Sequence, residues 1–521
     1  MAPSDGPFRH GCVATPHHVA SDAGLRVLRS GGNALDAAIA ANLVLGVVMP
    51  FSCGIGGDLF AMVWRDGDGP AAYNGSGRAP AAASIERVRE RAGGGAMPER
   101  GPLPVTVPGA VDGWHALLER FGTRSFAELC GPAMELATDG FEVSSFAAGH
   151  LAGSAAEFPA APAFDEWRRV YGDATAGATL RQPGLARTLE AVSASGPAAY
   201  YGGPVAEAIA GTVRRYGGLM TVDDLAGHRG EWVRPMRARY RDAEIVEMPP
   251  NTQGVAALEA LRLVDAAGPL AADGAARHHV LIEAVKIALA DRDRFVTDPD
   301  HMAIPAERLV SDAWVRERLH GLDPDKAGDP NATVVGGGDT VYLCAADGEG
   351  MLVSLIQSNF YGFGSGVTVP EWGINLQNRG ATFSLEPGHA NAIAPRKRTL
   401  HTLIPAMAFR GGRPWLVFGS MGGHAQAQIH VQLLARLVDD GDAPQAAIDA
   451  PRWTVEPAGW SVRAEHAFDA GAVAGLRDRG HRVSVAADPD EAMGWAQVIR
   501  CDPDGYVAGS DRRSEGAALG L

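Results

Sequence analysis

The sequence predicts a protein of the mixed α+β class, because helical and strand-like hydrophobic patterns occupy different parts of the chain. The chain has 521 residues, 46% of them hydrophobic, which is enough to bury a large core. Helical periodicity dominates residues 108–289, whereas strand-like runs follow residue 338. Length alone is compatible with one large α/β unit or with two to three domains.

The first 80 residues are expected to form two helices followed by a β-hairpin. Residues 21–28 have the pattern of a short amphipathic helix that stops at a Gly-Gly pair. Asn33 can then cap a second helix, apolar on most faces and therefore buried, which ends before Pro50. Residues 59–64 and 71–73 flank an Asp-Gly-Asp-Gly turn, which is typical of a hairpin.

The middle of the chain is expected to be helical, and the part after it to be rich in strands. The clearest helical patterns cover residues 110–121, 126–138, 204–216 and 278–295. A later helix over residues 429–438 is expected to pack on a sheet whose strands cover residues 340–346, 351–358, 403–409 and 414–418.

The turn at residues 347–350 sets the register of the first two of these strands. A hairpin centred between Gly348 and Glu349 puts Thr340 opposite Gln357 or Ser358. We therefore expect the hydroxyl groups of Thr340 and Ser358 to be neighbours.

Composition and charge exclude several classes of function. The 46 basic and 61 acidic side chains give a net charge of −15, so there is no basic field to hold nucleic acid or an anionic membrane surface. The five cysteines are far apart and never in C-x-x-C spacing, which argues against disulfides and a zinc site and favours a reducing compartment. The chain has neither a signal-peptide pattern nor an apolar span, so a cytoplasmic small-molecule enzyme is expected.

The sequence contains no motif for a cofactor or a metal, and we expect neither. The Gly-rich segments 54–57 and 362–366 lack the Lys-Ser/Thr of a P-loop, so turns are expected there. Neither H-E-x-x-H nor the G-x-S-x-G elbow of a serine hydrolase occurs. What remains is Thr340, which follows three glycines, 336–338, and Asp339; taken alone, it is usually explained by β-propensity after a loop.

A series of short motifs runs through the whole chain and changes this interpretation. Before Thr340 these are GGNALDAAIA (31–40), CGIGGDLF (53–60), VPGAVDGWHALLERFG (107–122), GGLMTVDDL (217–225), MPPNTQG (248–254) and ADRDRFVTDP (290–299). After it come the DGEG turn, GFGSG (362–366), GINLQNR (373–379), PRKR (395–398), GSMGG (419–423) and DAPRW (449–453). In this order, these motifs resemble those of the gamma-glutamyltransferase family.

The resemblance implies an N-terminal-nucleophile (Ntn) hydrolase fold, a four-layer αββα sandwich made as one precursor that cuts itself before Thr340. The expected products are a helix-rich large subunit, residues 1–339, and a small catalytic subunit, residues 340–521, which stay associated. A Thr at a new N-terminus supplies both nucleophile and base, because its free α-amine can accept the proton of its own hydroxyl. The glycines ahead of Asp339 would permit the backbone geometry that an N-to-O acyl shift requires.

The catalytic residues that the resemblance implies are present. Besides Thr340, Ser358 matches a hydroxyl that orients the amine of the nucleophile. Gly422 and Gly423 match a pair whose N–H groups form the oxyanion hole, and a plain turn is the alternative for this pair. Asn359 lies one residue before the position of a substrate-binding asparagine.

The substrate-binding positions depart from the family pattern. They correspond here to Ser76, with Arg78 two residues further on, and to Arg379, Thr382, His401 and Thr402. Thr382 replaces an aspartate that pairs with the α-ammonium of a glutamyl donor, and Arg379 replaces a glutamine. Acyl transfer is therefore expected to be retained while the glutamyl pocket is altered. The alternative for Arg78 and Arg379 is a structural salt bridge or a surface position.

The resemblance implies an amidohydrolase or acyltransferase that forms an acyl ester on Thr340 and passes the acyl group to water or to an amine. One hypothesis is gamma-glutamyl transfer from glutathione-like donors. A second, favoured by the altered pocket, is hydrolysis of another small anionic amide, such as oxamate or a glutaryl side chain of the cephalosporin type. A third is a processed but inactive scaffold that binds a ligand or partner.

Overall fold

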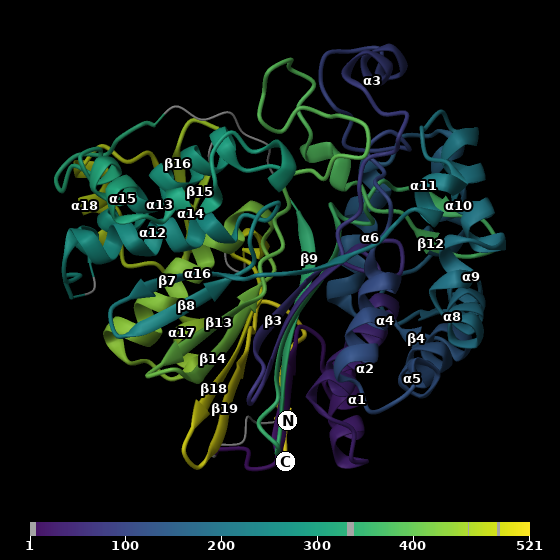
Figure 1. Cartoon of the computed structure of the whole chain (residues 1–521), viewed down its shortest axis with the longest axis horizontal. Coiled ribbons are helices and arrows are strands. Elements are labelled where there is room, and N and C mark those ends of the chain that lie inside the picture. Colours follow the sequence, from purple (N-terminus) through teal and green to yellow (C-terminus); the bar gives the residue numbers. More distant parts are fainter. Residues whose placement is uncertain (1–6, 273, 331–337, 457, 487–489) are drawn as a thin grey trace.

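Two antiparallel β-sheets lie face to face at the centre of the protein, and helices cover the outer face of each sheet (Figure 1). The computed structural model describes residues 7–272, 274–330, 338–456, 458–486 and 490–521. The layers follow one another as helix, sheet, sheet and helix, which confirms the predicted αββα sandwich.

The first sheet has seven strands, and both ends of the described chain lie close to it. Its strands, in spatial order, are β20 (Ala517–Gly520), β1 (Gly11–Thr15), β9 (Asp339–Asp347), β10 (Leu352–Phe360), β2 (Asp58–Arg65), β3 (Gly69–Asn74) and β6 (Glu231–Val233). The second sheet has six strands, which are β19 (Gly505–Ser510), β18 (Ala496–Asp502), β14 (Arg413–Ser420), β13 (Ala406–Arg410), β8 (Ala243–Glu247) and β7 (Met236–Tyr240). Each sheet therefore combines strands from both sides of the bond between residues 339 and 340.

Separate groups of helices pack on the two sheets (Figure 1). The group on the first sheet includes α1 (His18–Arg29), α2 (Ala34–Val48), α4 (Ala110–Phe121), α5 (Phe126–Asp139) and α8 (Pro183–Ser195). The group on the second sheet includes α12 (Gly254–Ala267), α13 (Ala275–Phe295) and α16 (Gln426–Leu434). The other helices are α3 (Ile85–Ala92), α6 (Ser145–Glu157), α7 (Asp165–Tyr171), α9 (Pro197–Tyr201), α10 (Pro204–Arg215), α11 (Val222–Ala226), α14 (Ala306–Leu309), α15 (Asp312–Leu319), α17 (Pro444–Asp449) and α18 (Ala470–Asp478).

Short strands outside the two main sheets complete the fold. They are β4 (Phe141–Glu142) with β5 (Thr179–Leu180), β11 (Thr368–Val369) with β12 (Ile374–Asn375), and β15 (Trp453–Glu456) with β16 (Ser461–Ala464) and β17 (Val483–Val485).

Helix α2 is the buried helix that the sequence predicts. Every residue of α2 except Gly46 is buried. Its first turn is closed by a capping box, in which the side chain of Asn33 accepts from the N–H of Asp36 and the side chain of Asp36 accepts from the N–H of Asn33. The start of this buried helix is therefore fixed by side chains that satisfy backbone N–H groups of its first turn.

The helical middle is the main correction to the sequence analysis. Strands β6, β7 and β8 interrupt it, and β7 and β8 form one edge of the second sheet. In β7, Met236 and Tyr240 are buried while Arg237 and Arg239 are exposed, which is the alternation of a half-buried edge strand. The predicted helices and the other predicted strands differ from the observed ones only at their ends.

Alternation along β9 decides which way the site faces. Val341 and Leu343 belong to the core between the first sheet and its helices, whereas Tyr342 and Cys344 belong to the core between the two sheets. Because successive side chains point to opposite faces, Thr340 faces the space between the sheets. The site therefore lies inside the sandwich.

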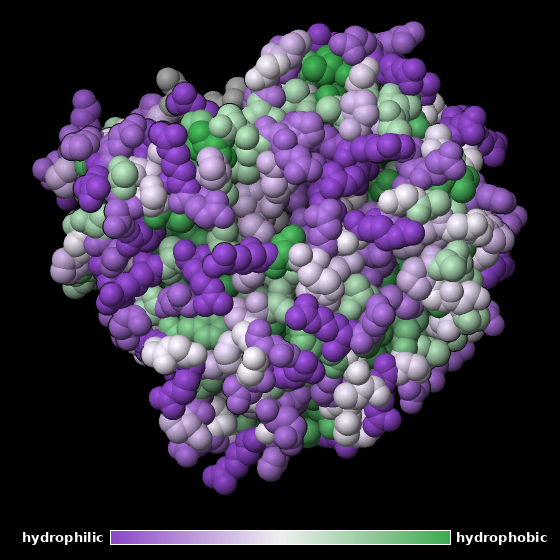
Figure 2. Space-filling model, in the orientation of Figure 1, coloured by the Kyte–Doolittle hydropathy of each residue, from purple (hydrophilic) through white to green (hydrophobic). Residues whose placement is uncertain are grey.

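The outer surface is mixed in character. The face shown in Figure 2 carries mostly hydrophilic side chains, with small hydrophobic groups between them. Within the described residues, no helix is long and apolar enough to cross a membrane.

Candidate active site

Thr340 is buried near the start of β9, where its hydroxyl meets the peptide bond that precedes it. Its side chain is fully buried. Oγ1 lies 2.7 Å from the carbonyl oxygen of Asp339 and 3.1 Å from Oγ of Ser358. The chain is continuous here, so this is the geometry before any cut.

A β-bulge in β10 brings Ser358 to the same bond. The register between β9 and β10 shifts between Gln357 and Phe360. Within this bulge, Oγ of Ser358 lies 2.5 Å from the carbonyl oxygen of Asp339 and accepts a hydrogen bond from the N–H of Phe360 at 2.7 Å. The hydroxyl of Ser358 thus lies against the bond that Thr340 would have to cleave.

One assignment of the hydrogens satisfies these donors together. The N–H of Phe360 and the hydroxyl of Thr340 both donate to Oγ of Ser358, and Ser358 donates its single hydrogen to the carbonyl oxygen of Asp339. In this assignment Ser358 polarises the carbonyl group that lies beside the hydroxyl of Thr340. The arrangement suits an attack by that hydroxyl on the preceding carbonyl carbon.

The glycine pair lies beside this segment. Gly338 has a φ of +142°, and a Cβ added to it would lie 3.1 Å from Cα of Gly423 and 3.1 Å from the ring of Phe360. Glycine is therefore required there both by the backbone conformation and by the close approach. Residues 336 and 337, the other two glycines of the predicted run, lie outside the described residues.

Gly422 and Gly423 join the end of β14 to the turn that opens α16. Their φ angles are +143° and +53°, a region that side chains other than glycine rarely adopt. Because they precede a helix, their N–H groups lie at its partly positive N-terminal end. Such a pair can donate to an oxyanion.

Two residues that the sequence analysis overlooked hold this pair. The side-chain amide of Gln253 donates 2.9 Å hydrogen bonds to the carbonyl oxygens of Gly423 and Thr402. Arg292 donates to Oε1 of Gln253 at 2.7 Å and pairs with Asp293. The peptide that carries the glycine pair is therefore fixed from behind by a buried network.

A third overlooked residue, Asp58, faces Ser358 across the sheet. Asp58 pairs with Ser358 in the register of β2 and β10, and it is fully buried. Its Oδ2 lies 3.1 Å from Nε2 of His401. The N–H of Leu403 donates to Nδ1 of His401, so the neutral ring carries its hydrogen on Nε2 and donates it to Asp58.

Burial dominates the electrostatics of Asp58. Burial raises the pKa of Asp58 to about 7, although the charge of Arg379 and three hydrogen bonds act in the opposite direction. These bonds to Oδ1 come from the N–H groups of Gly77 and Gly109 and from the side-chain amide of Gln377. Both carboxylate oxygens of Asp58 therefore already have hydrogen-bond partners within the protein.

Arg379 is a buried cation with unused hydrogen-bond donors. It is 1% exposed, and its guanidinium lies 3.9 Å from the ring centroid of Phe360. Nη1 donates to Oγ1 of Thr402 at 3.0 Å, whereas Nε and Nη2 have no hydrogen-bond partner among the described residues. Burial lowers the pKa of Arg379 to about 9, with Asp58 acting against this shift, so the group remains charged at neutral pH.

Asn359 and Thr382 also lie near this cluster. Asn359 is fully buried, and neither polar atom of its side chain has a partner among the described residues. Thr382 is different, because its hydroxyl already lies within hydrogen-bond distance of the carbonyl oxygens of Arg379 and Leu400 and of the hydroxyl of Thr399. Asn359 is therefore open to a ligand, whereas Thr382 is satisfied internally.

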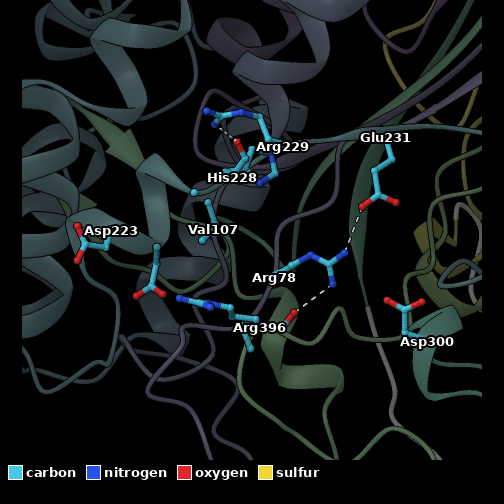
Figure 3. A pocket seen from close by; sticks show the side chains of 11 residues that line it. Arg78, Val107, Asp223, His228, Arg229, Glu231, Asp300 and Arg396 are labelled. Carbon is cyan, nitrogen blue, oxygen red and sulfur yellow. Dashed lines mark hydrogen bonds and ion pairs between the residues drawn. The ribbon is translucent and has the colours of Figure 1, made fainter.

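The side chains of Ser76 and Arg78 bond to residues outside this cluster, although the N–H of Gly77, which lies between them, donates to Asp58. The hydroxyl of Ser76 donates to Asn74 at 2.7 Å. Arg78 forms ion pairs with Asp298 at 3.1 Å and Glu231 at 3.2 Å, and it lines a separate cavity of about 550 Å³ (Figure 3). These ion pairs are of the kind that the alternative expectation for Arg78 describes, and a role of Arg78 in substrate binding stays a prediction.

One group of side chains has the composition of a metal site but serves as a hydrogen-bonded network. His279, Glu283 and His481 bring three ligand atoms within 4.8 Å of one another. However, His279 and His481 are hydrogen bonded at 2.7 Å, and the ammonium of Lys286 donates to Glu283 at 2.9 Å. The lysine already supplies the positive charge that a metal would bring, so we assign no metal there.

Comparison with known proteins agrees with the geometry around Thr340. The family model described as gamma-glutamyltranspeptidase matches residues 20–521. This chain belongs to the gamma-glutamyltranspeptidase family. It is 37% identical over 520 residues to the glutathione hydrolase-like YwrD proenzyme of Bacillus subtilis (strain 168), with 98% of each chain covered.

Two further relatives widen the range of activities within the gamma-glutamyltranspeptidase family. The oxamate amidohydrolase proenzyme of Klebsiella pneumoniae is 37% identical over 523 residues, again with 98% of each chain covered. The crystal structure of a cephalosporin acylase from Bacillus halodurans superposes with a TM-score of 0.95 at 38% identity, covering 100% of this chain and 97% of that one. The chain therefore has the Ntn-hydrolase fold of this family, and it is an enzyme of the kind that acts on amides.

Family motifs contained the residues that the sequence analysis overlooked. Asp58 lies in CGIGGDLF, Gln253 in MPPNTQG and Arg292 in ADRDRFVTDP. A polar side chain inside an otherwise apolar or Gly-rich motif was the available signal. The role of each such side chain becomes visible only when the fold brings these distant motifs together around the candidate site.

Proposed function

We propose that this member of the family cleaves amides through an acyl ester on Thr340, and that the acyl group carries an anion that binds Arg379. The observation that carries the proposal is the pair of unused N–H donors of Arg379. A buried guanidinium with free donors is costly unless a ligand completes its hydrogen bonds. A carboxylate fits two adjacent donors of a guanidinium in a fork.

The first step of this proposal is the self-cut that makes Thr340 an N-terminus. Oγ1 of Thr340 attacks the carbonyl carbon of Asp339, the C–N bond breaks, and the hydroxyl proton passes to the new α-amine. Water then hydrolyses the ester, leaving a carboxylate on Asp339 and a free hydroxyl on Thr340. The polarising contact from Ser358 supports this step.

In turnover the same hydroxyl attacks the amide of the substrate. The α-amine of Thr340 takes the hydroxyl proton and returns it to the leaving amine, and its ordinary pKa of about 7.7–8.0 suits this task near neutral pH. Gly422 and Gly423 would donate to the oxyanion. The acyl group then passes from Thr340 to water or to an amine.

Charge argues for an acyl group without an ammonium. Thr382 is neutral and already hydrogen bonded, and both oxygens of Asp58 are engaged by the protein, so neither is free to pair with the α-ammonium of a glutamyl group. An unpaired buried charge costs about 2–5 kcal/mol. A relative named for oxamate, an anionic amide that has no ammonium, agrees with such an acyl group.

The second candidate is gamma-glutamyl transfer or glutathione hydrolysis. The description of the family model and the name of the Bacillus subtilis relative favour it. An inactive scaffold is the third candidate, and the intact set of Thr340, Ser358, Gly422 and Gly423 argues against it. A cytoplasmic location remains part of the proposal, and the five cysteines, none in a disulfide, are compatible with it.

Two anilides that differ only by the α-amine test the substrate. We expect glutaryl p-nitroanilide to be cleaved with a kcat/KM roughly 30- to 3,000-fold above that of gamma-glutamyl p-nitroanilide, which follows from the charge cost given above. Preference for the gamma-glutamyl compound by about tenfold or more would establish the second candidate instead. Cleavage of neither compound by the cut protein would favour the scaffold.

Changing the charges at positions 379 and 382 tests the role of Arg379. The double variant Arg379→Gln, Thr382→Asp should move the preference toward the gamma-glutamyl compound, because it removes the cation and adds a partner for the ammonium. The single variant Arg379→Lys keeps the charge but not the fork, and should retain the order of preference with a higher KM.

A further inference from the structure

One side-chain amide joins two parts of the candidate site that lie far apart in the sequence. Gln253 is fully buried at the start of α12, and its Nε2 donates 2.9 Å hydrogen bonds to the carbonyl oxygens of Gly423 and Thr402. Gly423 belongs to the turn at residues 422–425, which we call the oxyanion turn. Thr402 belongs to the proposed acyl anchor, because its Oγ1 accepts a 3.0 Å hydrogen bond from Arg379.

The surroundings of this amide set its orientation. Nη1 of Arg292 donates to Oε1 of Gln253 at 2.7 Å, so the amide oxygen faces a cation and the amide nitrogen faces two carbonyl oxygens. The opposite orientation would place oxygen against oxygen and an N–H group against a cation. Arg292 is buried and donates from Nε to Asp293 at 2.8 Å. The backbone N–H of Gln253 donates to the carbonyl oxygen of His401 at 2.9 Å, which holds the main chain of this residue.

The oxyanion turn needs a restraint of this kind. Its two glycines have φ angles of +143° and +53°, and residues without side chains restrict the backbone least. The carbonyl oxygen of each glycine accepts the N–H group three residues further on. These local bonds shape the turn, but they do not fix its position relative to the acyl anchor. The bond from Gln253 comes from another segment of the chain and fixes that position.

The self-cut has a donor of its own. In the uncut chain, the hydroxyl of Ser358 donates to the carbonyl oxygen of Asp339 at 2.5 Å. Negative charge that develops on this oxygen during the cut is therefore stabilised by Ser358. In turnover the oxygen belongs to a substrate, and its proposed donors are the N–H groups of the oxyanion turn. The two reactions thus depend on different donors.

We propose that Gln253, oriented by Arg292, is a positioning residue that holds the oxyanion turn at a fixed place relative to the acyl anchor, and that turnover needs it whereas the self-cut does not. The inference rests on the proposed function, which takes Arg379 as the anchor and the glycine pair as the donors. A displacement of about 1 Å in a reacting geometry lowers a rate by up to about 100-fold, so loss of this amide should lower kcat.

Two ligands with the same carboxylate measure the position of the turn without turnover. Glutarate and 4-boronobutanoate both offer a carboxylate to Arg379, but only the boronate forms a tetrahedral adduct. Oγ1 of Thr340 bonds to boron, its proton passes to the α-amine, and a boron oxygen occupies the place of the oxyanion. By calorimetry on the cut wild type, we expect the boronate to bind at least about tenfold more tightly than glutarate. Gln253→Met, which removes the hydrogen bonds of the amide, should bring the ratio close to one and change glutarate binding less than about threefold.

Gln182→Met is the matched control. Gln182 is also buried, and its side-chain amide also donates to a backbone carbonyl oxygen, that of Val47, at 2.8 Å. This variant should keep the wild-type ratio. A wild type that binds both ligands equally overturns the proposed function and this inference with it. A wild-type preference for the boronate that persists in Gln253→Met overturns this inference alone, as does an equal loss of both ligands.

Kinetics separate turnover from the self-cut. For whichever anilide the wild type cleaves faster, Gln253→Met should lower kcat about 10- to 100-fold with KM within about threefold. Intact mass should show the two fragments forming at a rate within about threefold of the wild type. Gln253→Glu keeps the acceptor for Arg292 but not the N–H donors and should behave in the same way, whereas Arg292→Lys keeps a cation beside Oε1 and should retain most of kcat. Equal losses in the cut and in kcat would overturn the inference, because a general disturbance of the fold lowers both.

Discussion

Asp58 lies directly opposite Ser358 in the antiparallel pairing of β2 with β10, one strand away from the hydroxyl beside Thr340. Since cross-strand partners share a face of the sheet, the carboxylate and the two hydroxyl groups form one row in the space between the sheets. The ring of His401, which precedes strand β13 of the second sheet, is hydrogen bonded to the Asp58 end of this row. A titratable group therefore lies within the predicted acyl pocket.

The pH dependence of turnover should reflect Asp58. The α-amine of Thr340 must lose its proton to act as a base, so kcat/KM rises with pH at first. The pKa of Asp58 is about 7, and above that pH its negative charge offsets the charge of Arg379, which is proposed to hold the anionic acyl group. We expect a bell-shaped profile for glutaryl p-nitroanilide in the wild type, and in Asp58→Asn a ratio of the rates at pH 8.5 and 6.5 that is about threefold higher.

The pH dependence of stability should also reflect Asp58, and the direction of its pKa shift fixes the sign of that dependence. The native pKa of Asp58 lies above that of an unfolded chain, so the unfolded state loses this proton first, and stability falls as pH rises from about 4 to about 7. Thermal melts of Asp58→Asn should lose this part of the decline. Asp66→Asn, an exposed change in the turn after β2, is the matched control. Identical slopes in wild type and Asp58→Asn would contradict the assignment.

Maturation should depend on the hydroxyl of Thr340. We expect the purified protein to consist of two fragments, residues 1–339 and 340–521, because that hydroxyl lies 2.7 Å from the oxygen of the carbonyl group that it would attack. Thr340→Ala should remain a single chain, and Thr340→Ser should still be cut. Intact mass measures this directly. A cut at the same bond in the alanine variant would point to a host protease.

Loss of the Ser358 hydroxyl should slow both the cut and the turnover. Ser358→Ala removes the donor to the carbonyl oxygen of Asp339 and the acceptor of the N–H of Phe360. We expect a decrease of roughly 10²- to 10³-fold in each rate, as for the loss of one positioned donor. Ser358→Thr keeps the hydroxyl and is the control. Normal rates in the alanine variant would remove Ser358 from the site.

The glycine pair should matter for kcat more than for KM. Gly422→Ala or Gly423→Ala strains a left-handed backbone and moves the N–H groups, so kcat should fall roughly 10²- to 10³-fold. Gly412→Ala, in the exposed turn between β13 and β14, also has a positive φ and is a control for strain alone. Wild-type kcat in both variants of the pair would leave a plain turn as the explanation.

Local patterns were sufficient to predict the parts of the site that are close in sequence. The turn at residues 347–350 correctly made Ser358 a neighbour of Thr340, since a hairpin fixes its own register. The bulge at Ser358 could not be predicted, because it depends on contacts with the chain ahead of Thr340. Strand β7 was overlooked, although its alternation was present in the sequence.

Long-range pairs could not be predicted from the sequence. Arg78 was a candidate for substrate binding, and only the fold brings Asp298, more than 200 residues away, to its guanidinium. Arg379 was a candidate for the same reason, yet two of its nitrogens, Nε and Nη2, have no partner among the described residues. The two arginines had the same expected role. They differ because the tertiary structure places the carboxylate of Asp298 against Arg78, whereas Arg379 keeps unused donors.

The mixed origin of the two sheets determines how a cut enzyme would persist. Strand β9 lies between β1 and β10, and β10 lies against β2, so the segments before and after residue 339 alternate within one hydrogen-bonded sheet. Two fragments whose strands alternate in one sheet cannot separate without breaking the backbone hydrogen bonds between those strands. Their separation requires that the whole sandwich unfold, so dilution will not dissociate the nicked enzyme, and its working life is governed by a rate of unfolding.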